Sequence, residues 1–181
     1  MRGLAERLRF ETLLTELSAA FVNVPAAEVD GEIERWLRRI VEFLAIERGT
    51  VAQFDEGLED LVVTHSWTRP GWPPLPAIIP RQAIPWLRAK VLAGEAVVIP
   101  RLGDLPPEAW RDKETGLRAG TKAHLSIPLA VAGSIIGMAS FGSLRRERSW
   151  PEDLVRRLRL VGEIIANALM RKRTRRQLDE L

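Results

Sequence analysis

Residues 122–168 change their spacing of apolar residues partway along, and this predicts two strands followed by a helix. Leu125, Ile127 and Leu129 alternate with His124, Ser126 and Pro128, the period of two expected for a strand with two different faces, and apolar residues continue to 131. Residues 132–134 supply a turn containing glycine, and 135–141 predict the partner strand of a hairpin. Over 154–168 the apolar residues recur at alternating steps of four and three, which predicts one apolar stripe on a helix.

The predicted C-terminal helix has a start signal in front of it. Ser149 and Glu152 have the spacing of a capping box, and Pro151 is tolerated in a first helical turn. The apolar stripe of this helix is near the spacing of a coiled-coil seam, so we expect it to pair with a second copy. The residues expected in this dimer seam are Leu14, Leu17, Leu154, Leu158, Val161 and Ile165.

The first third of the chain predicts two helices and a second hairpin. Residues 4–21 carry one apolar face, and a second helix, beginning between residues 26 and 30 and ending at 44, follows the break at Pro25. Residues 48–54 and 60–67 predict two antiparallel strands joined by a polar turn.

The middle third differs in composition, because nine of the twelve prolines fall between residues 70 and 107. Residues 69–76 cannot form regular helix or central strand, and we expect a stiff loop that covers one face of the sheet. A polyproline ligand for another domain is the alternative. Residues 84–92 predict a short helix, 96–99 a short strand and 106–115 a helical turn.

These elements do not alternate regularly between strand and helix, so an α+β fold fits best. We expect a central, mainly antiparallel sheet of five to six strands. The terminal helices would pack on one face, and loops with short helices would cover the other.

Composition narrows the function classes. The 181 residues are 46% hydrophobic and 28% charged, as in an ordinary globular domain, and no apolar run is long enough to span a membrane. No cysteine is present, so a disulfide or a zinc–thiolate site is impossible. We therefore expect a cytoplasmic location. The net charge is only +3, and the basic C-terminal quarter predicts a solvated helix, so nucleic-acid binding is not expected.

No arrangement of residues predicts catalysis. His65 and His124 are the only histidines, and no third ligand accompanies them, so no metal site is expected. The glycines fit neither a phosphate-binding loop nor a dinucleotide motif, and no serine lies in a nucleophile elbow. We predict that the protein is not an enzyme.

Tryptophans gather in and beside the proline-rich segment, where they can line an apolar cavity with polar handles. Polar positions of the neighbouring strands can supply its floor. The predicted ligand pocket consists of His65, Trp67, Trp72, Trp86, Trp110, His124, Ser126 and Ser140. The alternative is that these tryptophans complete a second small core beneath the loops.

The C-terminal half resembles a GAF domain, the small sensory module of bacterial signalling proteins. The matching residues are 124–129, the turn at Gly133, Ile136-Gly137 and the helix entry at 149–154. The resemblance extends over about residues 10–171 and is greatest to GAF modules found beside PAS domains, histidine kinases and enhancer-dependent transcription activators. It implies the GAF/PAS-like fold expected above, with a ligand pocket between the sheet and its covering segments.

The resemblance also implies a domain plan and a function. Residues 1–24 would form a signalling and dimerisation helix, 25–170 the GAF domain, and 171–181 the basic start of a helix leading to an absent kinase or transcription-activator domain. The expected function is a homodimeric, non-catalytic sensor of a small molecule in a two-component or transcription-regulating system. The alternative is a ligand-free dimerising spacer.

The resemblance leaves the cofactor unknown. Covalent attachment of a bilin through cysteine is excluded by composition. Haem has no supported axial ligand, and the sequence pattern of cyclic-nucleotide-binding GAF domains is not visible. The methionine sulfoxide reductase activity of some GAF proteins needs cysteines, which this chain lacks.

Overall fold

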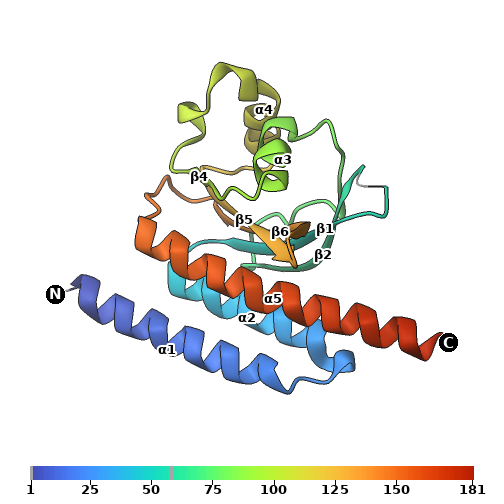
Figure 1. The fold of residues 1–181 in the computed structure, drawn as a ribbon. Coiled ribbons are helices and arrows are strands. Elements are labelled where there is room, and N and C mark those ends of the chain that lie inside the picture. The colour runs from blue at the N-terminus through green and yellow to red at the C-terminus, as the bar shows by residue number, and fades with distance from the viewer. Residues whose placement is uncertain (1, 58) are drawn as a thin grey trace.

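The computed structural model describes residues 2–57 and 59–181 and has an α+β fold (Figure 1). Within these residues, six strands form one antiparallel sheet in the order β3-β2-β1-β6-β5-β4. The strands are β1 Arg48–Phe54, β2 Leu61–Thr68, β3 Ile78–Ile79, β4 Val97–Ile99, β5 Ala123–Val131 and β6 Ser134–Ser143. The predicted fold class is confirmed, and β3 is a short strand that the proline-rich sequence did not indicate.

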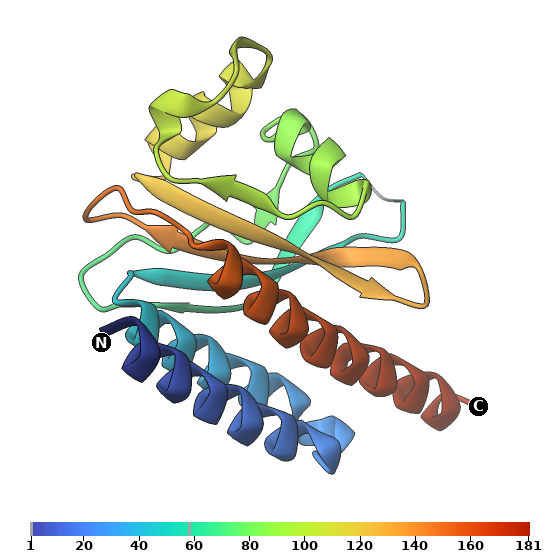
Figure 2. The ribbon, with the colours of Figure 1, turned by 60° about the vertical axis from the view of Figure 1, so that its left-hand side comes forward.

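Long helices cover one face of the sheet, called here the inner face (Figures 1 and 2). They are α1 Arg2–Val22, α2 Val29–Leu44 and α5 Glu152–Asp179. Helices α2 and α5 lie on the strands, and α1 packs against both of them. Helix α1 runs in the same direction as α5. Arg157 of α5 bonds to Glu11 in the middle of α1 (2.8 Å), and Arg171, further along α5, donates to the Phe21 carbonyl at the end of α1 (2.6 Å).

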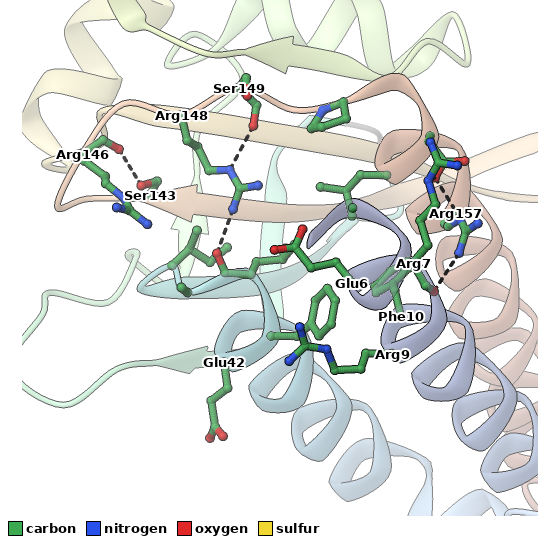
Figure 3. Close-up of a pocket in the computed structure, with 18 of the residues that line it drawn as sticks. Glu6, Arg7, Arg9, Phe10, Glu42, Ser143, Arg146, Arg148, Ser149 and Arg157 are labelled. Atoms are coloured by element: carbon green, nitrogen blue, oxygen red, sulfur yellow. Dashed lines mark hydrogen bonds and ion pairs between the residues drawn. The ribbon is translucent and has the colours of Figure 1, made fainter. Parts of the chain in front are cut away.

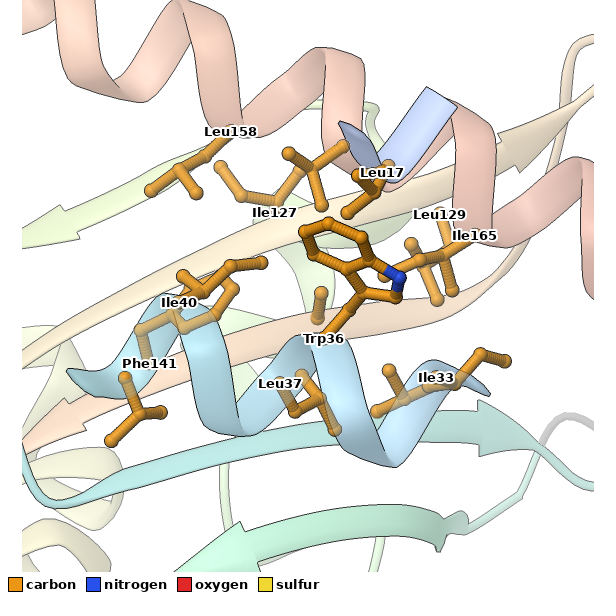
Figure 4. Close-up of a cluster of buried hydrophobic side chains, with 14 of the residues drawn as sticks. Leu17, Ile33, Trp36, Leu37, Ile40, Ile127, Leu129, Phe141, Leu158 and Ile165 are labelled. Carbon is orange, nitrogen blue, oxygen red and sulfur yellow. The ribbon is translucent and has the colours of Figure 1, made fainter. Parts of the chain in front are cut away.

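The main hydrophobic core lies between these helices and the sheet (Figure 4). Trp36 of α2 is buried near its centre, and its indole N–H donates to Glu32 Oε1 at 2.9 Å. Side chains from three helices and three strands meet around it. Those labelled in the figure are Leu17, Ile33, Trp36, Leu37, Ile40, Ile127, Leu129, Phe141, Leu158 and Ile165.

The burial of α1 and α5 corrects the predicted dimer seam. Leu17, Leu158, Val161 and Ile165 are at most 1% exposed within a single chain, and Leu14 and Leu154 are half-buried against the same core. A helix packed on its own sheet needs the same one-sided apolar stripe as a helix packed on a second copy. The spacing therefore predicted correctly that these side chains are buried, but they pack against the sheet of their own chain and not against a second copy.

The hairpin of β5 and β6 confirms the predicted turn, because Ala132 and Gly133 both have positive φ, 50° and 81°. The predicted capping box is wrong. Pro151 occupies the N-cap of α5 without a side-chain hydrogen bond. Helix α5 then continues unbroken to Asp179, and no helix among the described residues is long and apolar enough to cross a membrane.

The opposite, outer face of the sheet is covered by loops and by two short helices, α3 Pro85–Leu92 and α4 Trp110–Arg118. Asp112 of α4 joins the two helices, because its carboxylate accepts the backbone N–H groups of Trp86 (3.1 Å) and Leu87 (2.8 Å) at the start of α3. The first N–H groups of a helix have no partner within the helix and need such acceptors. The loops and the two short helices, called here the cover, are thus joined by hydrogen bonds and are not independent of one another.

Candidate functional site

A row of polar side chains lies on the outer face of the central strands, beneath the cover. The ladder places Arg48 of β1 beside Gly142 of β6, and Gly142 beside His124 of β5. The next row on the same face joins Thr50, Ser140 and Ser126. We call this group, together with Thr68, the polar floor; its members are Arg48, Thr50, Thr68, His124, Ser126 and Ser140.

Strand alternation explains why these residues share a face. Their immediate neighbours Val51, Leu125, Ile127 and Phe141 point the other way, into the core under the long helices. Sequence positions one residue apart therefore belong to two different environments, one polar and one apolar.

Hydrogen bonds connect the floor across β5 and β6. His124 Nε2 lies 2.7 Å from Ser126 Oγ, and Ser126 Oγ lies 2.9 Å from Ser140 Oγ. Ser126 and Ser140 are fully buried. Burial and the nearby charge of Arg48 lower the pKa of His124 to about 4, so its imidazole is neutral at physiological pH.

Arg48 brings a positive charge to the floor. Its guanidinium is buried and donates to the Pro73 carbonyl (3.0 Å), the Ala119 carbonyl (3.5 Å) and Thr121 Oγ1 (3.1 Å). Burial lowers the pKa of Arg48 to about 10, which still leaves it charged at neutral pH. Among the described residues no carboxylate forms an ion pair with it. Arg48 thus fastens two covering segments to the sheet and leaves its charge uncompensated.

Thr68 adds an unsatisfied group beside Arg48, its partner across β1 and β2. Its Oγ1 is buried and has no hydrogen-bond partner in the described part of the chain. A buried hydroxyl without a partner costs about 1–3 kcal/mol, so such groups are uncommon unless water or a ligand completes them.

The structure separates the residues that the sequence assigned to one pocket. His124, Ser126 and Ser140 come together on the floor. Trp86 of α3 packs against the apolar cluster between the short helices and the outer face of the sheet, which includes Leu87, Val91 and Met138 and is called here the outer cluster. Trp72 is half-buried in the proline-rich loop, with Arg145 6.0 Å from its ring, while Trp110 is 58% exposed on α4.

His65 and Trp67 are on the inner face, which corrects their assignment to the pocket. His65 is buried and shares a 2.7 Å hydrogen bond with Asp30, whose other oxygen binds Lys172 of α5. Trp67 packs against the helix-side core with Arg38 of α2 over its ring. The pattern of β2 gives two faces but does not say which one meets the helices.

Arg48, Thr50 and Thr68 were missed by sequence reasoning. The alternation of Arg48 and Thr50 with Gly49 and Val51 was visible, and it is the same period-two signal that identified Ser126. Nothing in the sequence links Thr68 to Arg48, because their pairing depends on the register of two strands.

The neutral imidazole of His124 predicts a pH-dependent stability. Between pH 6.5 and 4 the unfolded chain takes up a proton at this residue and the folded protein does not. The contribution of His124 to the free energy of unfolding is therefore fully present above pH 6.5. It is lost as pH is lowered towards 4, which amounts to roughly 3 kcal/mol for a shift of this size. We expect urea unfolding between pH 4.5 and 7.5 to show this slope, and His124→Asn to flatten it. Equal slopes in both proteins would contradict the prediction, since the carboxyl groups are common to both.

These features define a class: a small α+β module whose sheet carries helices on one face and a covered polar floor on the other. The model of the GAF domain family matches residues 29–169 of this chain. The chain therefore belongs to the GAF domain family, whose members are sensory or ligand-binding modules.

Solved structures share the fold at low sequence identity. The phycocyanobilin-bound GAF domain of a cyanobacterial phytochrome has a TM-score of 0.77 at 15% identity, over 92% of this chain and 96% of that one. The blue-light-absorbing form of the PixJ GAF domain of Thermosynechococcus elongatus gives 0.69 at 17%, over 88% and 95%. The free methionine-R-sulfoxide reductase of Neisseria meningitidis, solved with its substrate, gives 0.72 at 14%, over 91% and 90%.

Likeness at this level of identity concerns the fold alone. No curated protein sequence matches the chain. Neighbours with one architecture thus include photoreceptor domains and an enzyme, so the function must be argued from the residues of this chain.

Proposed function

We propose that this GAF domain is a non-catalytic sensory module of a bacterial signal-transduction protein, and that it binds a small polar molecule on the polar floor. The observation that carries the proposal is the buried, uncompensated charge of Arg48 beside the unsatisfied hydroxyl of Thr68. Ser126, Ser140 and the neutral His124 lie on the same face and can both donate and accept hydrogen bonds.

Strand β5 contributes to the polar floor on one face and contacts α5, the signalling helix of this proposal, on the other. Ser126 is on the outer face of β5, while the next residue, Ile127, packs under α5. Gly162 of α5 allows a close approach there, because a Cβ at that position would lie 3.1 Å from Ile127 Cγ2. A ligand that shifts β5 would therefore change the packing of α5, and α5 would pass that change to a connected output domain.

Dimerisation is part of the proposal, through residues that the fold leaves exposed. Leu8 of α1 and Leu160 of α5 are 56% and 51% exposed. Leu4, Val22 and Leu178 of the same helices are also exposed. Pairing two copies through these side chains would bury apolar surface without opening the core. The output domain in this proposal is a kinase or a transcription activator.

Native mass spectrometry of freshly purified protein tests ligand binding. We expect a small added mass that is diminished in a Ser126→Ala, Ser140→Ala double variant and retained in the exposed control Ser18→Ala. If no mass is retained, and no compound in a metabolite screen raises the melting temperature, the sensor proposal fails. The ligand-free spacer would then be the better description.

A further inference from the structure

A hollow lies on the helix side of the molecule, away from the polar floor (Figure 3). This helix-side cavity has a volume of about 910 Å³. It is bounded by the first turns of α1, the end of α2 and the segment that connects β6 to α5. Small-molecule sites in proteins are commonly about 300–1,000 Å³. None of the residues that line it belongs to the polar floor.

One wall of the helix-side cavity is apolar. The rings of Phe10 from α1 and Phe43 from α2 lie 5.1 Å apart in a tilted arrangement. Leu44, Ile46 and Leu154 continue this wall. Such a surface favours a ring or an alkyl group over an ion with no apolar part.

The charged groups of the lining do not balance. Several are already in ion pairs, namely Glu42 with Arg38, Glu147 with Arg101, and Asp153 with Arg7 and Arg157. Among the described residues that line the cavity, Arg9, Arg146 and Arg148 have no carboxylate within 4.0 Å, and Glu6 has no cation within that distance. Three unpaired guanidinium groups against one carboxylate leave an excess of two positive charges.

Arg148 is held in position before any ligand arrives. Its Nη1 donates to the Leu44 carbonyl at 2.8 Å and its Nε to the Ser149 carbonyl at 3.1 Å, which leaves the second terminal nitrogen without a bond to protein among the described residues. Burial, and then the positive charge of Arg146, lower the pKa of Arg148, while Glu6 acts in the opposite direction. Arg146 and Arg148 thus repel one another, and a bound anion would reduce this repulsion.

We propose that the helix-side cavity binds a small organic phosphate with an apolar group. The phosphate would lie against Arg9, Arg146 and Arg148, where a dianion matches the excess charge, and the apolar group would lie on Phe10 and Phe43. Guanidinium groups are well suited to phosphate because they present several N–H donors in one plane. A bound ligand would connect the start of α1 to the segment leading into α5, so it would stabilise the packing of the two terminal helices.

Isothermal titration calorimetry with three probes tests the proposal. Phenyl phosphate carries both features, inorganic phosphate only the charge, and phenol only the ring. We expect phenyl phosphate to bind at one site and the other two to bind at least about tenfold more weakly. Arg9→Gln with Arg146→Gln should raise the Kd of phenyl phosphate about tenfold, since both side chains are exposed and neither supports the core.

The matched control removes the same amount of charge elsewhere. Arg81 and Arg111 are exposed and do not line the cavity, so Arg81→Gln with Arg111→Gln should change the Kd less than about twofold. Absence of saturable phenyl phosphate binding would overturn the proposal, as would an equal loss in the control. Phosphate or phenol binding as tightly as phenyl phosphate would overturn the ligand class.

Discussion

Replacing Gly137 with alanine is expected to destabilise this domain severely. Gly137 lies in β6 between β1 and β5, opposite Gln53 and Leu129. A Cβ there would be 2.0 Å from the Ala52 carbonyl oxygen and 2.9 Å from Gln53 Cα. Backbone atoms of a central strand can move aside only by breaking the ladder, so we expect a cost above about 3 kcal/mol, a large share of a typical stability of 5–15 kcal/mol.

Circular dichroism and thermal unfolding measure this effect, and Gly103→Ala is the control. Gly103 has open space around the position of a Cβ and no positive φ, so that variant should unfold within a few degrees of the parent. A Gly137→Ala protein that is folded and melts like the Gly103→Ala control would show that β1 and β6 are not packed as closely as described.

Replacing Ile165 with aspartate is expected to unfold the chain and not merely to separate two copies of it. Ile165 is 0% exposed in the core between α5 and the sheet. The change removes a buried aliphatic group, worth about 2–5 kcal/mol, and adds the cost of burying a carboxylate without a partner. We therefore expect a loss of the cooperative thermal transition, measured by circular dichroism, at any protein concentration.

Leu160→Asp on the same helix separates folding from association. Leu160 is 51% exposed, so this variant should keep the parent's secondary structure and melt at nearly the same temperature. If the parent is dimeric by analytical ultracentrifugation, Leu160→Asp should shift its mass towards the monomer. A folded Ile165→Asp monomer would contradict the assignment of Ile165 to the core and would restore the seam first expected from its spacing.

The case of β2 shows how tertiary structure limited the prediction of the site. The pairing of β1 and β2 shifts register between Val51 and Ala52, where Val51 opposes His65 and Ala52 opposes Val63. Thr64 is the extra residue of a bulge, so Val63 joins the outer cluster while His65 points towards the helices. Unbroken alternation would have put Val63 and His65 on one face. The local sequence of β2 does not predict this bulge, because the bulge is defined by the pairing of β2 with β1.

The sequence by itself determined every strand except β3, the helices, the α+β class and the β5–β6 hairpin, because these depend on local periodicity and on a turn that needs positive φ. It also placed His124, Ser126 and Ser140 correctly with one another, since they share or adjoin neighbouring strands of that hairpin. Only the tertiary structure decided which face of each strand meets the helices. The tertiary structure also brought Arg48 and Thr68 next to these residues, and it packed the apolar stripe of α5 against the sheet of the same chain. Those contacts join residues far apart in the sequence.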